Sequence, residues 1–398
     1  MNSTECVGTA GYSVQIWDTV DAIDVPAWES LRVADDPFMD LRMLRVTAGT
    51  MPATDSFRFL LVRDGDGRPV AATCLWTLSI VGTMLSQDDW LIRAIKRVAA
   101  LIPTLNHHRI LVCGMPISAG QSNLRFAPGA DQASILKVLN EKLDEICRSE
   151  RLRCVVFKEF ESPDPKFASA LESLGYRRAN SLPMNECAPD YNSFEGYLKT
   201  LNSKKRSQIR NTYKKLQGGD VRLVVTSDPQ EVAALYTDRV HGLYHEILEN
   251  TEVQLETLTA GFFRELSREF PDETSYCFIL KGDVVLAFGV VLFAGRVAYP
   301  LYLGVDYDQN AEHELYFNTM YAMFDQSLQR GAELVSWGQT ADEFKRLKLN
   351  CYQTPRCIFL KGTTWVMRTV IGLLFSELFP ERVVASLPDR KMAAKRAA

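Results

Sequence analysis

Apolar and polar positions along the chain repeat one plan twice. An apolar run, a Gly/Asp turn and a second apolar run occupy Phe57 to Leu75, and the same succession returns from Tyr276 to Leu292. A short turn of this type between two apolar runs is typical of a β-hairpin. Further along each half, a helical pattern leads into an apolar strand. These later elements are Ile135 to Leu152 and Cys154 to Phe160 in the first half, and Leu315 to Gly331 and Glu333 to Gly338 in the second.

The repeat predicts an α+β fold of two lobes with a cleft between them, where small-molecule sites tend to lie. The chain of 398 residues is too long for one hydrophobic core, and two domains of roughly 180 to 200 residues are expected. The Pro/Asp/Asn cluster from Cys187 to Asn192 precedes Ser193, which is suited to cap a helix. We therefore predict an N-terminal lobe over residues 1–188. A C-terminal lobe, with a basic helix and a C-terminal helix, would span residues 189–398.

Other segments complete each lobe. A strand from Arg109 to Cys113 leads into the Gly/Pro-punctuated segment Gly114 to Asp131. Irregular loops of this length are uncommon without a role, so this segment is a candidate wall of a binding site. In the second lobe, helices over Pro229 to Ile247 and Leu255 to Phe270 are expected to cover a sheet that continues through Arg296 to Val305.

Composition limits the partners and the compartment. With 45 basic and 49 acidic residues the net charge is only −4, so no overall field favours DNA. The nine cysteines are odd in number, lie mostly in apolar patterns and form no CxxC pair. They are expected to be reduced core thiols of a cytoplasmic protein. The first residues show neither the basic start nor the apolar run of a signal peptide.

No stretch reaches the ~18 uncharged apolar residues of a spanning helix. The best candidate, Trp365 to Phe379, is interrupted by Arg368 and Glu377. This segment, like the basic stretch Trp90 to Ile102, is expected either to pack on the protein, which is the favoured interpretation, or to make peripheral contact with a membrane surface.

Seven basic residues and no acid lie between Lys199 and Lys215. On a helix, Arg206, Arg210 and Lys214 would share one stripe, and Ile209, Tyr213 and Leu216 would form the packed face. Two interpretations stay open. The stripe binds an anionic group, such as a phosphorylated donor, a sugar nucleotide or an RNA backbone, or it is a solvated face neutralised by acids of the other lobe.

The segment Glu312 to Tyr321 follows the predicted strand that ends at Val305. It is expected to begin a helix with Glu312, His313 and Glu314 at its start and with the aromatic residues Tyr316, Phe317 and Tyr321 on its first turns. The acids would then cap the helix and favour its dipole. Alternatively, Glu314 would act as a general base that deprotonates an amine nucleophile.

The segment Trp337 to Lys348 lies at the carboxyl end of the last predicted strand of the repeat, where ligands collect in α/β sheets. Lys345 or Lys348 would stabilise an oxyanion or hold a phosphate; otherwise, this is an ordinary helix with exposed charges. His241 and His245 lie one turn apart, but the order is not HExxH and no third ligand is evident, so no metal is expected. Walker, strand-linked GxGxxG, GxSxG and zinc motifs are missing.

Three stretches together resemble the FemAB-like predicted N-acyltransferases, which are built from two GNAT-type lobes in tandem. YLKTLNSKKRSQIRNTYKK is similar to the basic segment of that family, FFRELSREFPDETSYCFILKGDVVLAFGVVLF to its helix and hairpin, and ELYFNTMYAMFDQSLQRGAELVSWGQT to its helix, strand and turn. DEFKRLK takes the place of the E-H-K motif. The resemblance covers most of Tyr197 to Asn350.

The resemblance implies roles for individual residues. Lys345 would lie in the acyl-transfer site, Tyr316, Phe317 and Tyr321 would bind substrate, Arg206 and Arg210 would face the cleft, and Gly338 and Gln339 would contact the donor. The chain departs from the family at Asn318, Phe344 and Asn350, where Glu, His and Gly are frequent. The glycine-containing pyrophosphate loop of GNAT proteins is also missing after Val305.

The expected function is N-acyl transfer from a thioester or ester donor to a small-molecule amine, with acyl-CoA as the first donor to test. The basic helix leaves open a second enzyme, a transferase that uses aminoacyl-tRNA. The departures leave open a non-catalytic protein that binds an anionic metabolite.

Overall fold

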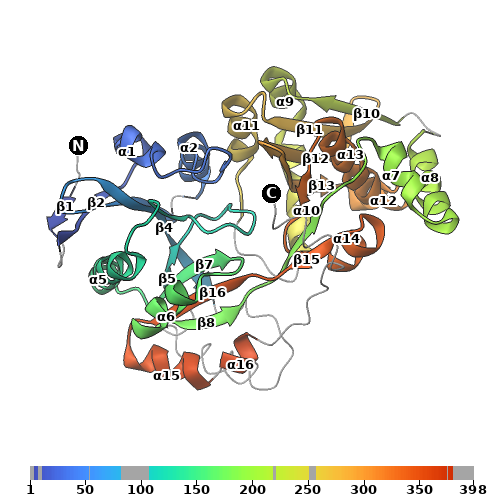
Figure 1. Ribbon diagram of the computed structural model, residues 1–398. Helices are drawn as coiled ribbons and strands as arrows, with labels where there is room; N and C mark the ends of the chain where they lie inside the picture. Colours follow the sequence, from blue (N-terminus) through green and yellow to red (C-terminus); the bar gives the residue numbers. More distant parts are fainter. Residues whose placement is uncertain are drawn as a thin grey trace. The chain divides into compact units, whose positions relative to one another are not determined.

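The computed structural model describes residues 4–7, 11–52, 54–81, 107–217, 221–250, 257–373 and 375–379 (Figure 1). The chain packs as two compact units. Unit 1 comprises Met1–Leu182, Val253–Thr257 and Pro355–Val383, and unit 2 comprises Pro183–Glu252, Leu258–Thr354 and Val384–Ala398. Each unit has its own β-sheet and helices, which confirms the predicted α+β class. The segment Trp90 to Ile102 and the predicted helix start at Leu255 lie outside the described residues.

Unit 1 is built on a nine-stranded sheet in the order β1-β2-β3-β4-β5-β7-β16-β8, with β6 paired to β4. The predicted first hairpin is confirmed as β3 and β4, and β5 runs parallel to β7. β16, which follows unit 2 in the sequence, lies between β7 and β8 and is antiparallel to both. The strands are β1 (Thr4–Val7), β2 (Ser13–Trp17), β3 (Ser56–Arg63), β4 (Pro69–Val81), β5 (His107–Cys113), β6 (Leu124–Phe126), β7 (Cys154–Phe160), β8 (Arg177–Asn180) and β16 (Cys357–Gly362).

One long helix provides much of the apolar core of unit 1. Asp131 caps its start, since the Asp131 side chain accepts a hydrogen bond from the Ser134 backbone N–H at 3.3 Å, and its residues Ile135, Leu139 and Leu143 are buried in the core. The helices of unit 1 are α1 (Val25–Glu29), α2 (Leu41–Thr50), α5 (Gln132–Glu150), α6 (Pro165–Ser173), α15 (Trp365–Leu373) and α16 (Phe375–Leu378), with a short 3₁₀ turn η2 (Val20–Ala22).

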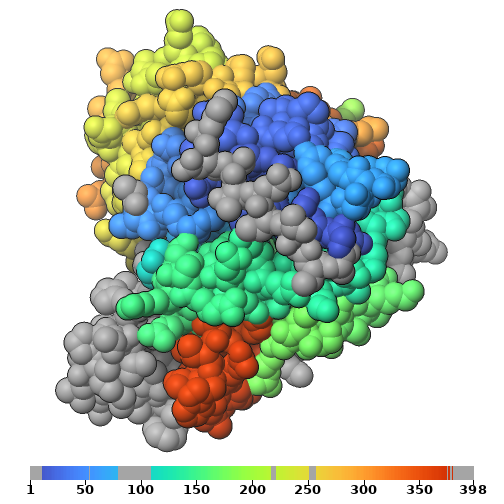
Figure 2. All heavy atoms as spheres, turned by 90° about the vertical axis from the view of Figure 1, so that its left-hand side faces the viewer, coloured from blue at the N-terminus to red at the C-terminus, as the bar shows by residue number. Residues whose placement is uncertain are grey.

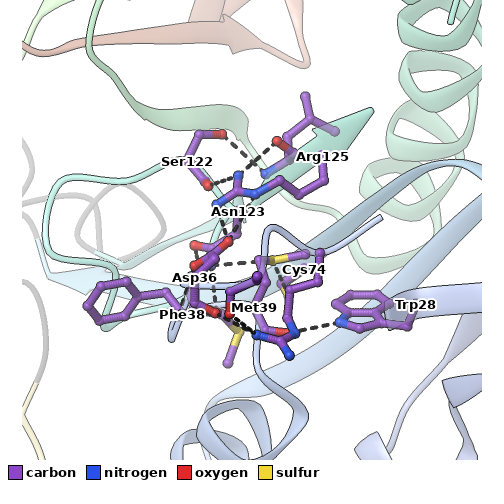
Figure 3. A network of polar contacts seen from close by, with 12 residues as sticks. Trp28, Asp36, Phe38, Met39, Cys74, Ser122, Asn123 and Arg125 are labelled. Atoms are coloured by element: carbon purple, nitrogen blue, oxygen red, sulfur yellow. Dashed lines mark hydrogen bonds and ion pairs between the residues drawn. The ribbon is translucent and has the colours of Figure 1, made fainter. Parts of the chain in front are cut away.

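Buried polar side chains anchor the segment between β5 and α5, which contains the short strand β6 (Figure 3). Asn123 Oδ1 accepts a hydrogen bond from the Met115 backbone N–H at 2.9 Å, and its Nδ2 donates to the Phe38 carbonyl at 3.0 Å. Arg125 Nε donates to Asp36 Oδ2 at 3.0 Å, and Asp36 Oδ1 accepts from the Phe38 backbone N–H at 3.0 Å. These bonds satisfy groups that would otherwise be buried without partners, so the segment is a fixed part of unit 1.

Unit 2 is built on a seven-stranded sheet in the order β10-β11-β12-β13-β14-β9-β15. The predicted second hairpin is confirmed as β11 and β12, and the cross-over from β13 through α12 and α13 to the parallel strand β14 follows the predicted plan. The strands are β9 (Met184–Cys187), β10 (Val221–Thr226), β11 (Thr274–Lys281), β12 (Val284–Ala294), β13 (Val297–Val305), β14 (Leu334–Ser336) and β15 (Tyr352–Thr354). The helices are α7 (Phe194–Thr200), α8 (Ser203–Gln217), α9 (Pro229–Leu235), α10 (Asp238–Glu249), α11 (Ala260–Glu269), α12 (Tyr307–His313), α13 (Leu315–Gln329) and α14 (Asp342–Lys348).

Two glycines allow helices to approach the middle of this sheet closely. A Cβ atom at Gly289 on β12 would lie 2.7 Å from Met323 Sδ on α13. A Cβ atom at Gly304 on β13 would lie 2.7 Å from the backbone atoms Leu243 C and Tyr244 N on α10. The close contact of α10 with β13 therefore depends on the absence of a Cβ atom at Gly304.

The structure differs from the predicted elements in two ways. The helix predicted over Pro229 to Ile247 is two helices, α9 and α10, because Thr237 Oγ1 accepts a hydrogen bond from the Val240 backbone N–H and starts a new helix. The predicted lobes 1–188 and 189–398 differ from the two units at β9, which belongs to unit 2, and at the segment Pro355–Val383. This segment carries β16, α15 and α16 and belongs to unit 1, so the C-terminal helix is not part of the predicted C-terminal lobe. β9 pairs with β14 and β15 of unit 2, and β16 pairs with β7 and β8 of unit 1.

We predict opposite effects for two glycine-to-alanine substitutions. Gly304→Ala should lower the free energy of unfolding by about 1–3 kcal/mol, because the added methyl group meets helix backbone that cannot move aside. Gly242→Ala, inside α10 with open space around its Cβ position, should raise it by about 0.5–1 kcal/mol. Urea unfolding of both variants checks this pair, and an equal effect of the two substitutions would contradict the close packing of α10 on β13.

Candidate active site

The parallel pair β13 and β14 marks the candidate active site. Only Val297–Leu334 and Ala298–Val335 are paired, although β13 continues to Val305. In the described part of the chain, no other strand pairs with β13 on that side. Just beyond the last of these pairs, a β-bulge at Leu301 interrupts the register of β13 against β12, where Val290 pairs with Tyr302 and Val291 with Pro300. The ends of parallel strands that stop pairing are places where ligands bind in α/β proteins.

The backbone that leaves β14 is held by two buried polar side chains. Asn185 on β9 is fully buried, and its Nδ2 donates to the Gly338 carbonyl at 3.0 Å and to Asp342 Oδ1 at 2.7 Å. Lys345 Nζ donates to the Trp337 carbonyl at 2.6 Å. The strand exit, the following turn and the start of α14 are therefore fixed to one another, and we call residues 337–345 the β14 exit.

Lys345 is the most unusual titratable group of the β14 exit. Only 5% of the residue is exposed. Burial lowers the pKa of Lys345 from 10.5 to about 8, and the nearby Cys351 and Asp342 oppose that shift. Near neutral pH this amine is consequently close to the point at which it both donates and accepts protons. A lysine with a pKa in this range suits proton transfer.

Aromatic side chains from three helices gather beside α14. Phe317 stacks on Phe344 with ring centroids 5.0 Å apart, and Tyr316 and Tyr321 each lie with their ring centroids 6.0 Å from that of Phe344. Tyr213 on α8 stacks on Tyr321 at 6.0 Å. The structure thus brings together the three aromatic residues expected to bind substrate, and it adds Phe344 and Tyr213. Phe317 and Phe344 are half-buried, so part of their surface is open.

Glu314 lies at the start of α13, as predicted, whereas Glu312 and His313 do not. Glu312 and His313 end α12, and Glu314 connects α12 to α13 in the left-handed backbone region with φ 51°. The predicted capping by Glu314 is wrong, because its side chain makes no cap hydrogen bond; it accepts one from Lys215 Nζ at 2.8 Å. Burial raises the pKa of Tyr321, and the negative charge of Glu314 adds to this effect, so the Glu314 carboxylate lies near the aromatic group.

The basic segment forms α8, and its packed face is as predicted, with Ile209 and Leu216 buried. Arg206 is half-buried, and its Nη2 donates to the Leu201 carbonyl at 2.9 Å. Arg210 is exposed and pairs with Glu195 at 2.7 Å. The stripe is thus partly neutralised within unit 2. The predicted direction of both arginines toward a cleft between lobes stays a prediction.

Two exposed lysines of the same helix have no acidic partner among the described residues. Lys204 and Lys214 are exposed, and their ammonium groups pair with no acid in the described part of the chain. Lys348, the alternative to Lys345, donates from Nζ to Gln208 Oε1 of α8 at 2.9 Å. The surface of α8 near α14 is therefore cationic.

The turn at Gly338 and Gln339, which are expected to contact the donor, directly follows β14 and Trp337. Gly338 has φ 79° and open space at its Cβ position. Sequence analysis did not identify the neighbouring residue Asn185, since the adjacent segment, Cys187 to Asn192, indicated only a domain boundary. Asn185 Oδ1 and Trp337 Nε1 are buried and have no hydrogen-bond partner among the described residues. Buried polar atoms of this kind call for a partner such as water or a ligand.

The histidine pair lies elsewhere in unit 2, on α10. His241 Nε2 and His245 Nε2 are 3.1 Å apart, and the Tyr236 hydroxyl lies 3.1 Å from His241 Nδ1. Burial, with His245 adding to it, lowers the pKa of His241. No group of three metal-binding side chains occurs among the described residues.

The fold and the site define an α+β protein in which a buried lysine and an aromatic group lie at the end of a parallel strand pair. A family model described as FemAB-like, peptidoglycan biosynthesis and recognition, matches residues 19–346. The chain belongs to the FemAB-like family. The match includes β13, α13 and Lys345.

Several solved structures are similar over most of the chain. A tandem GNAT protein from the clavulanic acid biosynthesis pathway is 13% identical, with 87% of this chain and 94% of that chain covered and a TM-score of 0.46. FemX is 12% identical, with 80% and 90% covered and a TM-score of 0.47. The C-terminal domain of a lysylphosphatidylglycerol synthetase, described as putative, from Agrobacterium fabrum is 11% identical, with 92% and 100% covered and a TM-score of 0.47. None is similar enough to transfer an activity to this chain. No curated protein matches it.

We predict that Lys345 makes stability depend on alkaline pH. Between about pH 8 and 10.5 the folded chain binds fewer protons at this lysine than the unfolded chain does, so the free energy of unfolding rises with pH there. Relative to Lys345→Met, which has no group to titrate at this position, the wild-type chain should gain up to roughly 3 kcal/mol across that range. Urea unfolding at several pH values measures the difference. A difference that stays constant with pH would contradict the buried, deprotonating amine.

Proposed function

We propose that this chain is an N-acyltransferase that moves an acyl or aminoacyl group from a thioester or ester donor to an amine. Membership of the FemAB-like family supports the class of enzyme. The observation that carries the proposal is Lys345, a buried lysine held at the carboxyl end of β14 with a pKa of about 8. A group of this kind in a structured site is a functional candidate on physical grounds.

The chemistry requires three events. The neutral amine attacks the carbonyl carbon and forms the C–N bond, the carbonyl oxygen becomes an oxyanion, and the bond to the thiolate or alkoxide breaks when the oxyanion returns to a carbonyl. A lysine ammonium has three donors, and the described residues use one of them, at the Trp337 carbonyl. In this proposal a second donor stabilises the oxyanion or protonates the leaving group. Glu314 takes the proton that the amine releases.

The donor would lie along the part of β13 that β14 leaves unpaired, with its carbonyl at the β14 exit. Gly338 allows close approach because it carries no side chain. In this proposal the buried Trp337 Nε1 and Asn185 Oδ1, which have no partner among the described residues, bind polar groups of the donor. Phe317 and Phe344 offer an aromatic surface to the acceptor or to the acyl chain.

A second candidate, an ester donor carried on tRNA, is favoured by one observation. The Tyr316 backbone N–H at the start of α13 already donates to Asn310 Oδ1 at 2.9 Å, so it is not free for a pyrophosphate. Phosphates would instead meet Lys204 and Lys214, the exposed lysines of α8 that lack an acidic partner. An acyl-CoA donor carries far fewer phosphates than tRNA and would depend less on these lysines.

Single-turnover assays with the full chain test the proposal. A panel of acyl-CoA and aminoacyl-tRNA donors is offered with a panel of primary amines, after mass spectrometry has identified any donor fragment that is retained on the purified protein. Lys345→Ala should lower kcat/KM about 100-fold with the active pair. Arg346→Ala, an exposed neighbour on the same helix, should leave it unchanged.

Full turnover by Lys345→Ala would overturn the role of this lysine, and no transfer from either donor class would overturn the enzyme and favour a binding protein. Lys204→Glu combined with Lys214→Glu separates the two donors. If the wild-type chain uses aminoacyl-tRNA and the double variant loses that activity, the tRNA donor is supported. If the wild-type chain uses acyl-CoA and the double variant keeps that activity, the thioester donor is supported.

A further inference from the structure

One helix of unit 1 exposes an apolar face that the fold does not use. The two most exposed large apolar side chains among the described residues, Leu373 at 76% and Trp365 at 75%, both lie on α15. Val366 and Val370 on the same helix are exposed by 47% and 39%. The described part of this C-terminal segment, in red, lies open at the surface in Figure 2.

The other side of α15 explains why the helix is held in this orientation. Ile371 is buried with Ala179 and Leu360 against the end of the unit 1 sheet. A Cβ atom at Gly362 on β16 would lie 2.6 Å from the Arg368 backbone N, so the helix is in close contact with that strand. α15 thus packs on unit 1 through the side that carries Ile371, and its opposite, apolar side faces outward.

The exposed face offers almost no polar group to water. Trp365, Val366, Val370 and Leu373 adjoin one another on the helical surface. Thr369 lies among them, and its hydroxyl is already used, since Oγ1 donates to the Trp365 carbonyl at 3.0 Å. A contiguous exposed patch of this kind marks an interaction surface.

The charges beside the patch are positive. Arg368 is the one charged residue in the sequence of α15. On the adjacent strand β8, Arg177 and Arg178 are exposed, and the guanidinium carbon of Arg177 lies 4.3 Å from the centre of the Phe375 ring. Tryptophan and leucine on one face with arginines at its border is the pattern of helices that lie in the surface of an anionic membrane.

Charge also decides between a membrane and a second copy of the chain. A two-fold interface sets the same patch against itself, so the arginines at its border would approach one another. The sequence after the described residues, 380–398, contains the basic residues Arg382, Arg390, Lys391, Lys395 and Arg396 against the acids Glu381 and Asp389. Anionic lipid headgroups would be attracted to all of these cations.

We propose that α15 docks unit 1 on an anionic lipid surface, with Trp365, Val366, Val370 and Leu373 in the interface and Arg177 and Arg368 at the headgroups. No helix among the described residues is long and apolar enough to cross a membrane. Docking would be peripheral and reversible, and it would bring the chain to substrates held at a lipid surface.

Vesicle flotation with the full chain tests the proposal. The wild-type chain should float with vesicles of equal parts phosphatidylcholine and phosphatidylglycerol, and not with phosphatidylcholine alone. Trp365→Ser combined with Leu373→Ser should weaken binding about tenfold or more. Val33→Ser, which removes an apolar side chain exposed by 61% elsewhere in unit 1, should leave binding unchanged. Raising salt from about 0.05 M to about 1 M should also weaken it.

Thermal unfolding of each variant, which should match that of the wild-type chain, separates lost docking from lost folding. If the Trp365→Ser, Leu373→Ser variant unfolds, Val366→Ser combined with Val370→Ser tests the same face and should also weaken vesicle binding. Failure of the wild-type chain to bind, or equal binding to both kinds of vesicle, would overturn the proposal. So would a wild-type dimer in sedimentation that Trp365→Ser abolishes, because the face would then be a protein interface.

Discussion

The candidate site depends on one buried amide. Asn185 bridges the Gly338 carbonyl and Asp342, and its own backbone pairs with Trp337 and Gly338. This fixes where β14 ends and where α14 begins, and therefore where Lys345 reaches the Trp337 carbonyl. Without that bridge the Asp342 carboxylate would lose this hydrogen bond, and the Gly338 carbonyl would keep only the bond from the Asn185 backbone N–H. Each hydrogen bond lost in this way typically costs about 0.5–1.5 kcal/mol. The chemistry proposed for Lys345 thus rests on a side chain that is not itself proposed to react.

Chain order explains how the amide comes to this place. β9 precedes the helices of unit 2 in the sequence, yet it lies between β14 and β15 in the sheet. β16 follows β15 of unit 2 in the sequence, yet it pairs in the sheet of unit 1. Both strands are short, and each is flanked by turn-forming residues. Hairpins such as β3 and β4 could be predicted because their pairing is local and their turn chemistry is specific. β9 and β16 could not, because long-range pairing leaves no periodic signal in four to six residues.

The site was partly predictable for the same reason. Tyr316, Phe317 and Tyr321 share a helix, and helical spacing predicts that they face one direction. Their contact with Phe344, and the burial of Lys345, depend on how α14 packs, which spacing does not reveal. Glu314 does lie at the start of α13, where acids are favoured, but its left-handed backbone conformation and the lack of a capping hydrogen bond could not be predicted from helical spacing.

Hydrogen exchange of the backbone amides, with and without the donor that supports turnover, tests the central claim most directly. The account predicts slower exchange for residues 301–305 of β13 and for the β14 exit, and no change for β3 and β4 of unit 1. Protection confined to unit 1, or no protection along β13, would contradict a donor site at the end of the parallel strand pair.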